Sequence, residues 1–328
     1  MYKNKMKIQI PTRSSYTDDQ LLFAKQMGLE NVFVIFEDED SNYEGVMRFI
    51  DRCDKFGLTV NDAGNSNLYK HPAIHLGLEG RDELIEKYNN FNRALGKAGI
   101  KVGYITWDQG RVSTTKFAVG PHTRGSVGRI VDMEELYSRP LAFGREYERE
   151  EIWANFKYFM DRVLPVCEEA DIRLALHPND PPVAKLEGVC NLIYRAQDYK
   201  RAFDLVDNSP YLGMKFCVGC WLEGGEQFGN ILDDIKYFVE NKKVFTVHYR
   251  NISAPLPYFE ETYIENGHAN MHEIIRQFIV NDYEGAIHCD HVPSFVSSVG
   301  GQDASFAYAT GYLKAQINSI ISELNRNA

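Results

Sequence analysis

The sequence has little that would place the protein in a membrane or on a nucleic acid. It contains no apolar run near the roughly 20 residues that a transmembrane helix needs. The N-terminal stretch MYKNKMKIQIPT is basic but has no apolar signal-peptide core. Basic residues are outnumbered, with 36 Lys and Arg against 46 Asp and Glu and a formal net charge of −10. We therefore expect a cytoplasmic protein without a nucleic-acid or membrane partner.

Cysteine is also scarce. Six cysteines in 328 residues, with no signal peptide, do not indicate a disulfide framework. Cys53, Cys167 and Cys190 fall on predicted helix faces, where we expect reduced thiols. Cys217-x-x-Cys220 could also be read as a redox pair or half of a zinc knuckle. The sequence has no second CxxC, which weakens the zinc-knuckle interpretation.

What the sequence has in quantity is alternation of short apolar, β-branched runs with amphipathic helical stretches. Strands are predicted near 7–12, 32–36, 58–62, 102–107, 173–178, 212–217, 244–249 and 285–290. Helices are predicted over 17–27, 42–57, 80–98, 149–170, 190–206, 227–241, 270–281 and 303–325. Glycines 28, 57 and 99 follow three of these helices, as expected for C-terminal stops. Eight strands, each followed by a helix, predict an α/β protein: a (β/α)8 TIM barrel in a single domain, 1–328.

One connection is unusually long. Residues 108–148 separate the fourth strand from the fourth helix, and a loop of this length is uncommon in a compact domain. It carries the basic residues Arg111, Lys116, Arg124 and Arg129. Two hypotheses remain open: a solvated surface excursion, or a lid whose arginines, Arg124 among them, bind an anionic substrate.

Four consecutive predicted strands end at a side chain that can bind a metal ion: His177, Cys217, His248 and Asp290. In a TIM barrel the functional groups lie at the C-terminal ends of the strands. The four side chains are therefore expected side by side on one rim. Thiolate by itself favours zinc or iron, whereas imidazole and carboxylate also suit manganese, so the ligands alone do not select the ion.

Other polar residues near strand ends are candidates for catalysis and substrate binding. His291, beside Asp290, is the first candidate for acid/base chemistry, although it could instead orient Asp290. Arg250 could bind a substrate carboxylate with two hydrogen bonds, or form an ordinary ion pair at the rim. Asn251 and His75 are further candidates for substrate binding.

Five segments carry a resemblance to a known family. They are NFNRALGKAGIKVGYITW (90–107), LALHPNDPP (174–182), GMKFCVG (213–219), VHYRN (247–251) and CDH (289–291). These strings resemble those of mannonate dehydratase, a manganese-dependent barrel related to xylose isomerase.

The resemblance implies a xylose isomerase-like fold and a Mn²⁺ cofactor, with Zn²⁺, Fe²⁺ and Co²⁺ as alternatives. The implied ligands are His177, Cys217, His248 and Asp290. It also implies an acid/base role for the pair Asp290 and His291.

The resemblance is weaker around the expected substrate. Where the family reads Gly-Asp-x-Asp-Met, this chain reads GHANM (267–271). The family's Arg-Pro before the Asp-His pair is replaced by His288-Cys289. A family tyrosine after that pair has no aligned counterpart, although Tyr308 lies nearby. These departures favour a relative whose substrate differs from that of the other members.

Three functions are consistent with these patterns. The first is a metal-dependent carbon-oxygen lyase that dehydrates a sugar acid, such as D-mannonate, to a 2-keto-3-deoxy acid or acts on a related sugar derivative. The second is a metal-dependent sugar isomerase or epimerase, which Cys217 argues against because such enzymes use carboxylate-rich metal sites. The third is a non-catalytic sugar-binding relative. For each, a small-molecule partner and a homo-oligomer are expected.

Overall fold

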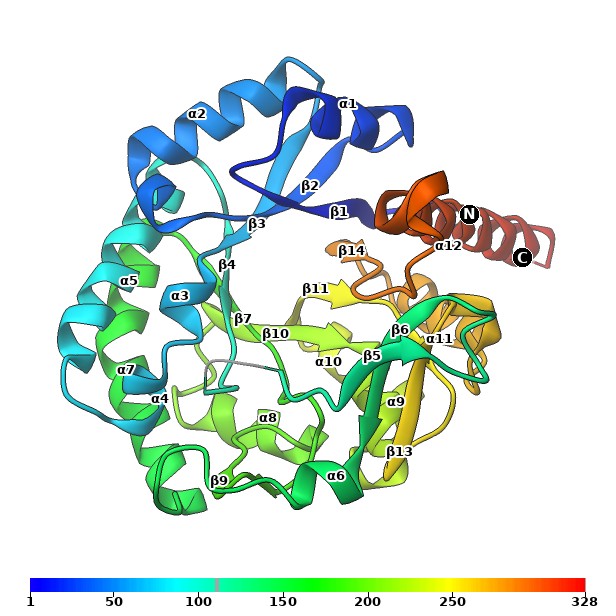
Figure 1. Ribbon diagram of the computed structural model, residues 1–328. Helices are drawn as coiled ribbons and strands as arrows, with labels where there is room; N and C mark the ends of the chain where they lie inside the picture. Colours follow the sequence, from blue (N-terminus) through cyan, green and yellow to red (C-terminus); the bar gives the residue numbers. More distant parts are fainter. Residues whose placement is uncertain (110–111, 328) are drawn as a thin grey trace. The chain divides into compact units, whose positions relative to one another are not determined.

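Eight strands of the protein form a closed parallel barrel. The computed structural model describes residues 1–109 and 112–327. The order of the strands in the barrel is β1-β14-β11-β10-β7-β4-β3-β2. The strands are β1 (Lys7–Arg13), β2 (Asn31–Ile35), β3 (Thr59–Gly64), β4 (Val102–Ile105), β7 (Arg173–Leu176), β10 (Leu212–Cys217), β11 (Val244–His248) and β14 (Ala286–His288). Each one overlaps a predicted strand (Figure 1), so the predicted TIM barrel is confirmed.

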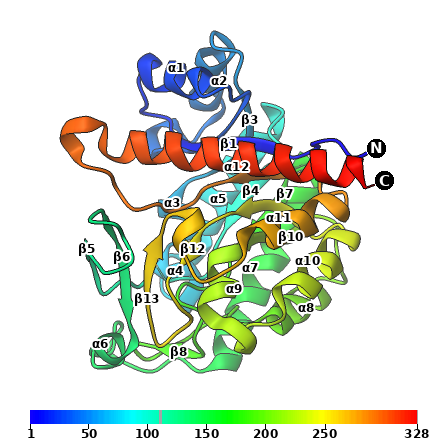
Figure 2. The same ribbon diagram turned by 90° about the vertical axis from the view of Figure 1, so that its right-hand side faces the viewer.

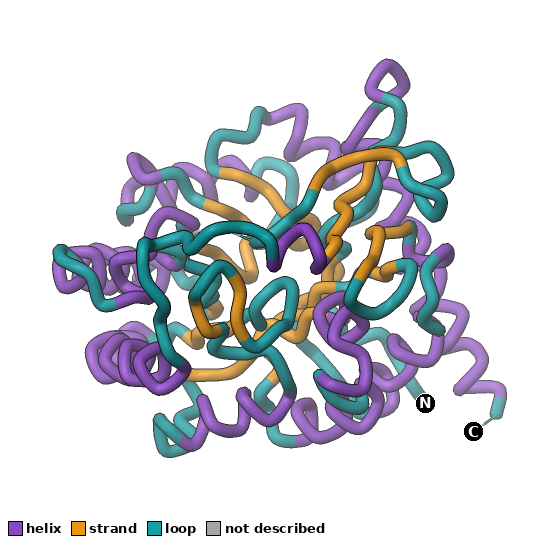
Figure 3. Tube along the Cα trace, turned by 60° about the horizontal axis from the view of Figure 1, so that its bottom comes forward, coloured by secondary structure: helices purple, strands orange, loops and turns teal. Residues whose placement is uncertain are grey.

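The helices between these strands also agree with the predicted ranges. They are α1 (Asp18–Gln26), α2 (Tyr43–Asp54), α5 (Arg81–Lys97), α7 (Arg149–Ala170), α8 (Ala196–Asp204), α10 (Ile231–Glu240), α11 (Met271–Val280) and α12 (Gly301–Arg326). The alternation of strand and helix can be followed by colour in Figure 3. No helix in the described ranges combines the length and apolarity needed to span a bilayer.

Two helices, α8 and α10, start several residues later than predicted, at Ala196 and Ile231. Helix α8 begins at Ala196, because Val189 and Cys190 form the short strand β9, which pairs with β8 (Lys185–Leu186). The prediction that Cys190 lies on a helix face was therefore wrong. Cys53 and Cys167 do lie on helices, buried in α2 and α7.

The chain divides into two compact units. The first comprises Met1–Ile8, Ser113–Arg139 and Phe216–Ala328, and the second comprises Gln9–Val112 and Pro140–Lys215. The single domain of residues 1–328 stays a prediction.

In the second unit, β2 pairs in parallel with both β1 and β3, and β4 pairs with β3 and β7. The α-helices around these strands end as the sequence predicted. Gly28, Gly57 and Gly99 have φ of 69°, 66° and 87°, the left-handed conformation that glycine adopts without a steric penalty. At these three helices, local backbone chemistry thus indicates where the helix stops.

In the first unit, β14 pairs with β11 and with the start of β1. The buried Tyr249 follows β11, and its hydroxyl lies 2.6 Å from the Met271 carbonyl and 2.8 Å from Gln316 Oε1. It thereby joins the end of β11 to α11 and α12. Asn325 of α12 also bonds both backbone groups of Tyr2, so the two ends of the chain lie together (Figure 2).

The long connection after β4 is not a structureless loop. Residues 113–139 contain β5 (Lys116–Val119), β6 (Val127–Asp132) and α6 (Met133–Tyr137). Strands β5 and β6 form a hairpin, and β6 pairs with β13 (Tyr258–Thr262) in a four-stranded sheet ordered β12-β13-β6-β5, where β12 is Asn251–Ile252. Figure 2 shows β6 beside β13. Strand β5 is largely exposed and β6 is mostly buried, so both the surface-excursion and the lid hypotheses stay predictions.

Asn179 connects two loops of the second unit. Its amide nitrogen donates to the Trp107 carbonyl at 2.9 Å and to Asp108 Oδ1 at 3.2 Å. Its amide oxygen accepts from the Ile193 backbone N–H at 2.9 Å. The loops that follow β4 and β7 are thus held together by one buried side chain.

We predict that Asn179→Ala lowers the free energy of unfolding by about 2–4 kcal/mol, because buried polar groups lose their partners. Urea denaturation would measure the change. Asn90→Ala is the control: Asn90 is exposed on α5, and its loss should change stability by no more than about 0.5 kcal/mol. Equal effects of the two substitutions would contradict the assignment.

Candidate active site

Three of the four predicted metal ligands come together in the first unit. Cys217, His248 and Asp290 each offer a ligand atom, and these atoms lie within 4.8 Å of one another. Cys217 is the last residue of β10 and the N-cap of α9 (Val218–Gly224), while His248 is the last residue of β11. Asp290 follows β14 by two residues. Strand ends therefore position all three side chains.

The fourth predicted ligand, His177, lies in the second unit directly after β7. Its Nδ1 is 2.7 Å from the Pro178 carbonyl oxygen. A ring nitrogen that donates to a backbone carbonyl leaves the other nitrogen, Nε2, as the one that can bind a metal ion.

Asp290 is surrounded by cationic and potentially cationic groups. Its Oδ2 lies 3.0 Å from His248 Nδ1 and 3.3 Å from Arg250 Nε. Burial by itself would raise the pKa of Asp290, but His248, His291 and Arg250 hold it well below its usual range. This carboxylate is therefore ionised near neutral pH, as a metal ligand must be.

Beside this triad is a set of buried charges that the sequence analysis did not identify as a group. Arg250 Nη1 lies 2.7 Å from Glu223 Oε1, and Arg129 Nη1 lies 3.5 Å from the same oxygen. Arg129 also contacts Glu261 at 3.2 Å. All four side chains are at most 3% exposed. Two arginines thus neutralise two carboxylates out of contact with water.

A weak sequence signal for these carboxylates exists. Glu223 lies in CVGCWLEGG, and Glu261 lies in PYFEETY. A charged residue within an otherwise apolar or aromatic run is one of the few signs of a buried ion pair, since Glu is almost never fully buried unless it is paired. The sequence does not reveal the partners.

His291 is partly exposed to solvent and contacts the buried carboxylate of Glu261. Its side chain is 41% exposed, while Nδ1 lies 2.8 Å from Glu261 Oε1 and Nε2 lies 3.7 Å from Asp290 Oδ1. Burial lowers the pKa of His291, but Asp290 and Glu261 outweigh that effect and raise it to about 9. Among the residues predicted to be catalytic, it is the most exposed to solvent.

Arg250 and Asn251 make contacts that support structural roles. Arg250 is 1% exposed, and its guanidinium contacts Glu223, Asp290 and, at 3.8 Å, Cys220 Sγ. These contacts agree with the ion-pair alternative for Arg250. Asn251 binds backbone groups: its amide nitrogen donates to the carbonyls of Ile264 and Ala269. A contact of either residue with substrate stays a prediction.

The arginines of the long connection do not share one environment. Arg124 lies 3.1 Å from Glu265 and over the ring of Tyr263, and it is partly exposed. Arg129 is buried. The lid hypothesis had instead placed this arginine against the substrate. Arg111 lies outside the described residues. Binding of an anionic substrate by Arg124 stays a prediction.

His75 of the second unit is enclosed by its own neighbours. It is buried and stacks on Trp107 at a centroid distance of 4.2 Å. Its Nε2 lies 3.0 Å from the Tyr69 carbonyl, and its Nδ1 accepts from the Gln109 backbone N–H. Burial lowers the pKa of His75 to about 3. Both ring nitrogens are therefore engaged within the protein. A contact of His75 with substrate stays a prediction.

The second unit also has a carboxylate at a strand end that the sequence analysis did not select. Asp108 follows β4, is nearly buried, and accepts hydrogen bonds from the Thr106 hydroxyl and from Asn179. Burial raises the pKa of Asp108, opposed by Lys70 and His177. Its location after β4 was available from the sequence, but its burial was not.

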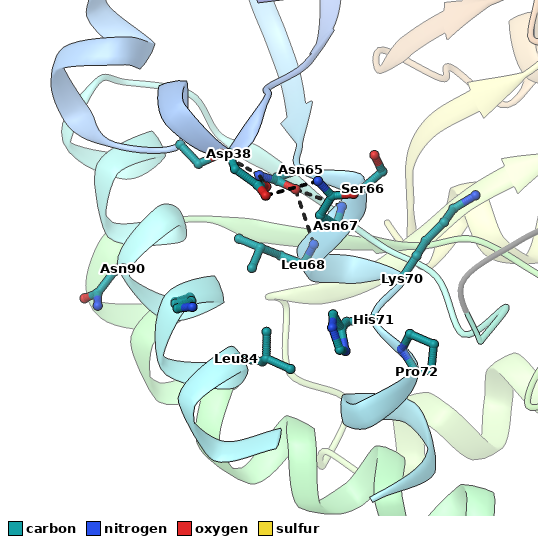
Figure 4. A pocket seen from close by; sticks show the side chains of 12 residues that line it. Asp38, Asn65, Ser66, Asn67, Leu68, Lys70, His71, Pro72, Leu84 and Asn90 are labelled. Carbon is teal, nitrogen blue, oxygen red and sulfur yellow. Dashed lines mark hydrogen bonds between the residues drawn. The ribbon is translucent and has the colours of Figure 1, made fainter. Parts of the chain in front are cut away.

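A cavity of about 700 Å³ lies in the second unit, in the loops after β2 and β3 (Figure 4). Asn65 donates to Asp38 at 2.8 Å and caps the short helix α3 (Ser66–Tyr69) through the backbone N–H groups of Asn67 and Leu68. These bonds of Asn65 are dashed in Figure 4. None of its lining residues is a predicted site residue.

Comparison with known proteins identifies the family. The model of the family described as D-mannonate dehydratase (UxuA) matches residues 128–320. The chain is 30% identical over 285 residues to the mannonate dehydratase of Thermotoga petrophila, and the match covers 76% of this chain and 77% of that protein.

Solved structures agree with the fold. The crystal structure of mannonate dehydratase from Streptococcus suis serotype 2 has a TM-score of 0.85 at 21% identity and covers 98% of this chain and 96% of that chain. A xylose isomerase domain protein from Planctomyces limnophilus has a TM-score of 0.64 at 13% identity, over 98% of this chain and 100% of that chain. These similarities confirm a xylose isomerase-like barrel. With a family model that matches more than half of its residues and a relative of 30% identity, this chain belongs to the D-mannonate dehydratase family.

Proposed function

We propose that this protein is a divalent-metal-dependent hydro-lyase that dehydrates a sugar acid, D-mannonate or a related hexonic acid, to a 2-keto-3-deoxy acid. The proposal rests on one observation above the others: Cys217, His248 and Asp290 converge next to His291. Membership of the D-mannonate dehydratase family supports the reaction class. The sequence departures at 267–271 and at His288 favour a substrate other than D-mannonate itself.

The donor atoms fit a divalent cation. A thiolate, an imidazole and a carboxylate within 4.8 Å of one another match the spacing of ligands that bind one ion at about 2.0–2.3 Å. We propose that His177 is the fourth ligand through Nε2, because β7 is the strand next to β10 in the barrel. Mn²⁺ is the proposed ion, and Zn²⁺, Fe²⁺ and Co²⁺ are alternatives because a thiolate also suits softer metals.

Dehydration breaks two bonds of the sugar acid. The proton on C2, beside the carboxylate, must leave to a base, and the C3 hydroxyl must leave as water after it is protonated. The resulting enol then becomes the 2-ketone. When bound, the divalent ion would stabilise the negative charge that develops next to the carboxylate.

We assign proton transfer to His291. Its side chain is 41% exposed, so a substrate can contact it. Because Nδ1 lies 2.8 Å from Glu261, Nε2 is the nitrogen left to exchange a proton with substrate. The Asp290 side chain, next in sequence, would help to hold the ion, so the proton-transfer group is adjacent to a proposed metal ligand.

We predict that the Mn²⁺-loaded protein removes one water from a hexonic acid. A panel that includes D-mannonate, followed by product mass and by a carbonyl reagent, would measure this. Turnover of another acid but not D-mannonate would indicate that the altered residues changed the substrate. A new sugar with unchanged mass would instead indicate an epimerase, and no reaction with any acid would contradict the proposal.

We predict that Cys217→Ser weakens binding of the divalent ion by at least about 10-fold, because a ligand is replaced by a poorer donor. Elemental analysis after dialysis against a chelator would measure the bound metal. Cys220→Ser is the matched control, since Cys220 lies one helical turn away and should leave metal content unchanged. Equal loss in both variants would favour the CxxC interpretation.

We predict that His291→Asn lowers kcat by about 10²–10⁴-fold, the usual contribution of general acid–base catalysis, while metal content stays the same. Steady-state kinetics and elemental analysis would test this together. His272→Asn, on the partly exposed start of α11, is the control and should keep full activity. Normal kcat in His291→Asn would rule out the assigned role.

A further inference from the structure

One buried oxygen atom of the first unit receives three contacts from nitrogen. Glu261 Oε1 lies 2.8 Å from His291 Nδ1, 3.2 Å from Arg129 Nη1 and 3.7 Å from Arg250 Nη1. The Glu261 side chain is 3% exposed, so these protein groups take the place of water around it. A charge-assisted hydrogen bond in such an environment is short and directional.

We propose that Glu261 is a positioning residue that orients the imidazole of His291 for proton transfer at Nε2, and that the β5–β6 hairpin supports it through Arg129. This inference rests on the proposed function of His291. According to this proposal, the long connection after β4 contributes to the active site through Arg129, which contacts Glu261 and not the substrate.

The exposure of His291 explains why such a residue is needed. An imidazole that is 41% exposed is not held in one orientation by packing alone. Rotation of the ring by half a turn about Cβ–Cγ would exchange Nδ1 for a carbon atom and break the bond to Glu261. The carboxylate therefore favours the one orientation in which Nε2 points away from Glu261.

Arg129 is built to hold Glu261 in place. Its Nη1 contacts Glu261, its Nε donates to Thr114 Oγ1 at 3.0 Å, and its Nη2 donates to the Ser113 carbonyl at 2.9 Å. All of these groups except Glu261 belong to the inserted segment 113–139. Without Arg129, Arg250 would be the remaining one of these two arginines beside the buried carboxylates Glu223 and Glu261. Burial of two carboxylates beside one arginine costs free energy in a low-dielectric interior.

The adjacent residue on β13 provides a matched control. Glu260 is 1% exposed, but successive side chains of a strand point to opposite faces, and Glu260 contacts other groups. Its Oε2 accepts from the His122 backbone N–H at 2.9 Å, and its Oε1 accepts from the Tyr258 hydroxyl at 3.2 Å. Removal of Glu260 thus tests the loss of a buried carboxylate without removing the contact to His291.

We expect Glu261→Ala to lower kcat by about 10²–10⁴-fold, with KM and bound metal within about threefold of the wild type. Glu261→Gln should recover at least about 10-fold of this loss, because its amide oxygen can still accept from Nδ1–H. Glu260→Ala should retain kcat. Equal kinetic losses in Glu260→Ala and Glu261→Ala, or an unchanged kcat in Glu261→Ala, would overturn the proposal.

A second measurement does not depend on turnover or on whether Glu261→Ala folds. In proton NMR spectra of the metal-free protein, the His291 Nδ1–H bonded to Glu261 should give a low-field signal that is absent in His291→Asn. The signal should move in Glu261→Gln and persist in Glu260→Ala. Its absence from the wild type would overturn the positioning role, whereas its presence in a protein that dehydrates no sugar acid would overturn only the proposed function.

Discussion

The ion pairs among Arg129, Glu223, Arg250 and Glu261 constrain how the first unit assembles. None of these side chains is more than 3% exposed, so each charge must be neutralised by another protein group. A buried ion pair adds little stability relative to apolar packing, but the loss of one member is strongly destabilising. The elements that carry these residues, β6, α9, β13 and the end of β11, therefore have to assemble together.

This requirement explains the environment of the candidate catalytic residues. Asp290 and His291 follow a strand of only three residues and lie in the loop after it. Arg250 holds Asp290, and Glu261 holds His291. These two contacts hold a metal-competent carboxylate and a partly exposed imidazole next to each other in a loop. They provide the rigid support that a precise site requires.

Much of the candidate site could be predicted because a parallel barrel places residues by a simple rule. Side chains at strand ends lie on one rim, and the strand ends can be found from local apolar runs. Cys217, His248 and Asp290 were located in this way, and so was His177. The supporting residues follow no such rule: Glu261 and His291 are 30 residues apart in sequence, and their contact depends on how β13 pairs with β6.

The sequence by itself determined the eight barrel strands, the approximate ranges of most helices between them, the helix stops at Gly28, Gly57 and Gly99, and the side chains offered at the strand ends. These depend on periodicity and backbone preferences within a few residues. Only the tertiary structure decided that 113–139 is a hairpin that pairs with β13 and that Arg129 is buried. It also decided that Arg250 faces Glu223 and Asp290. These outcomes depend on which distant segments share a sheet and on which charges must be neutralised away from water, and a single sequence does not record such long-range pairings.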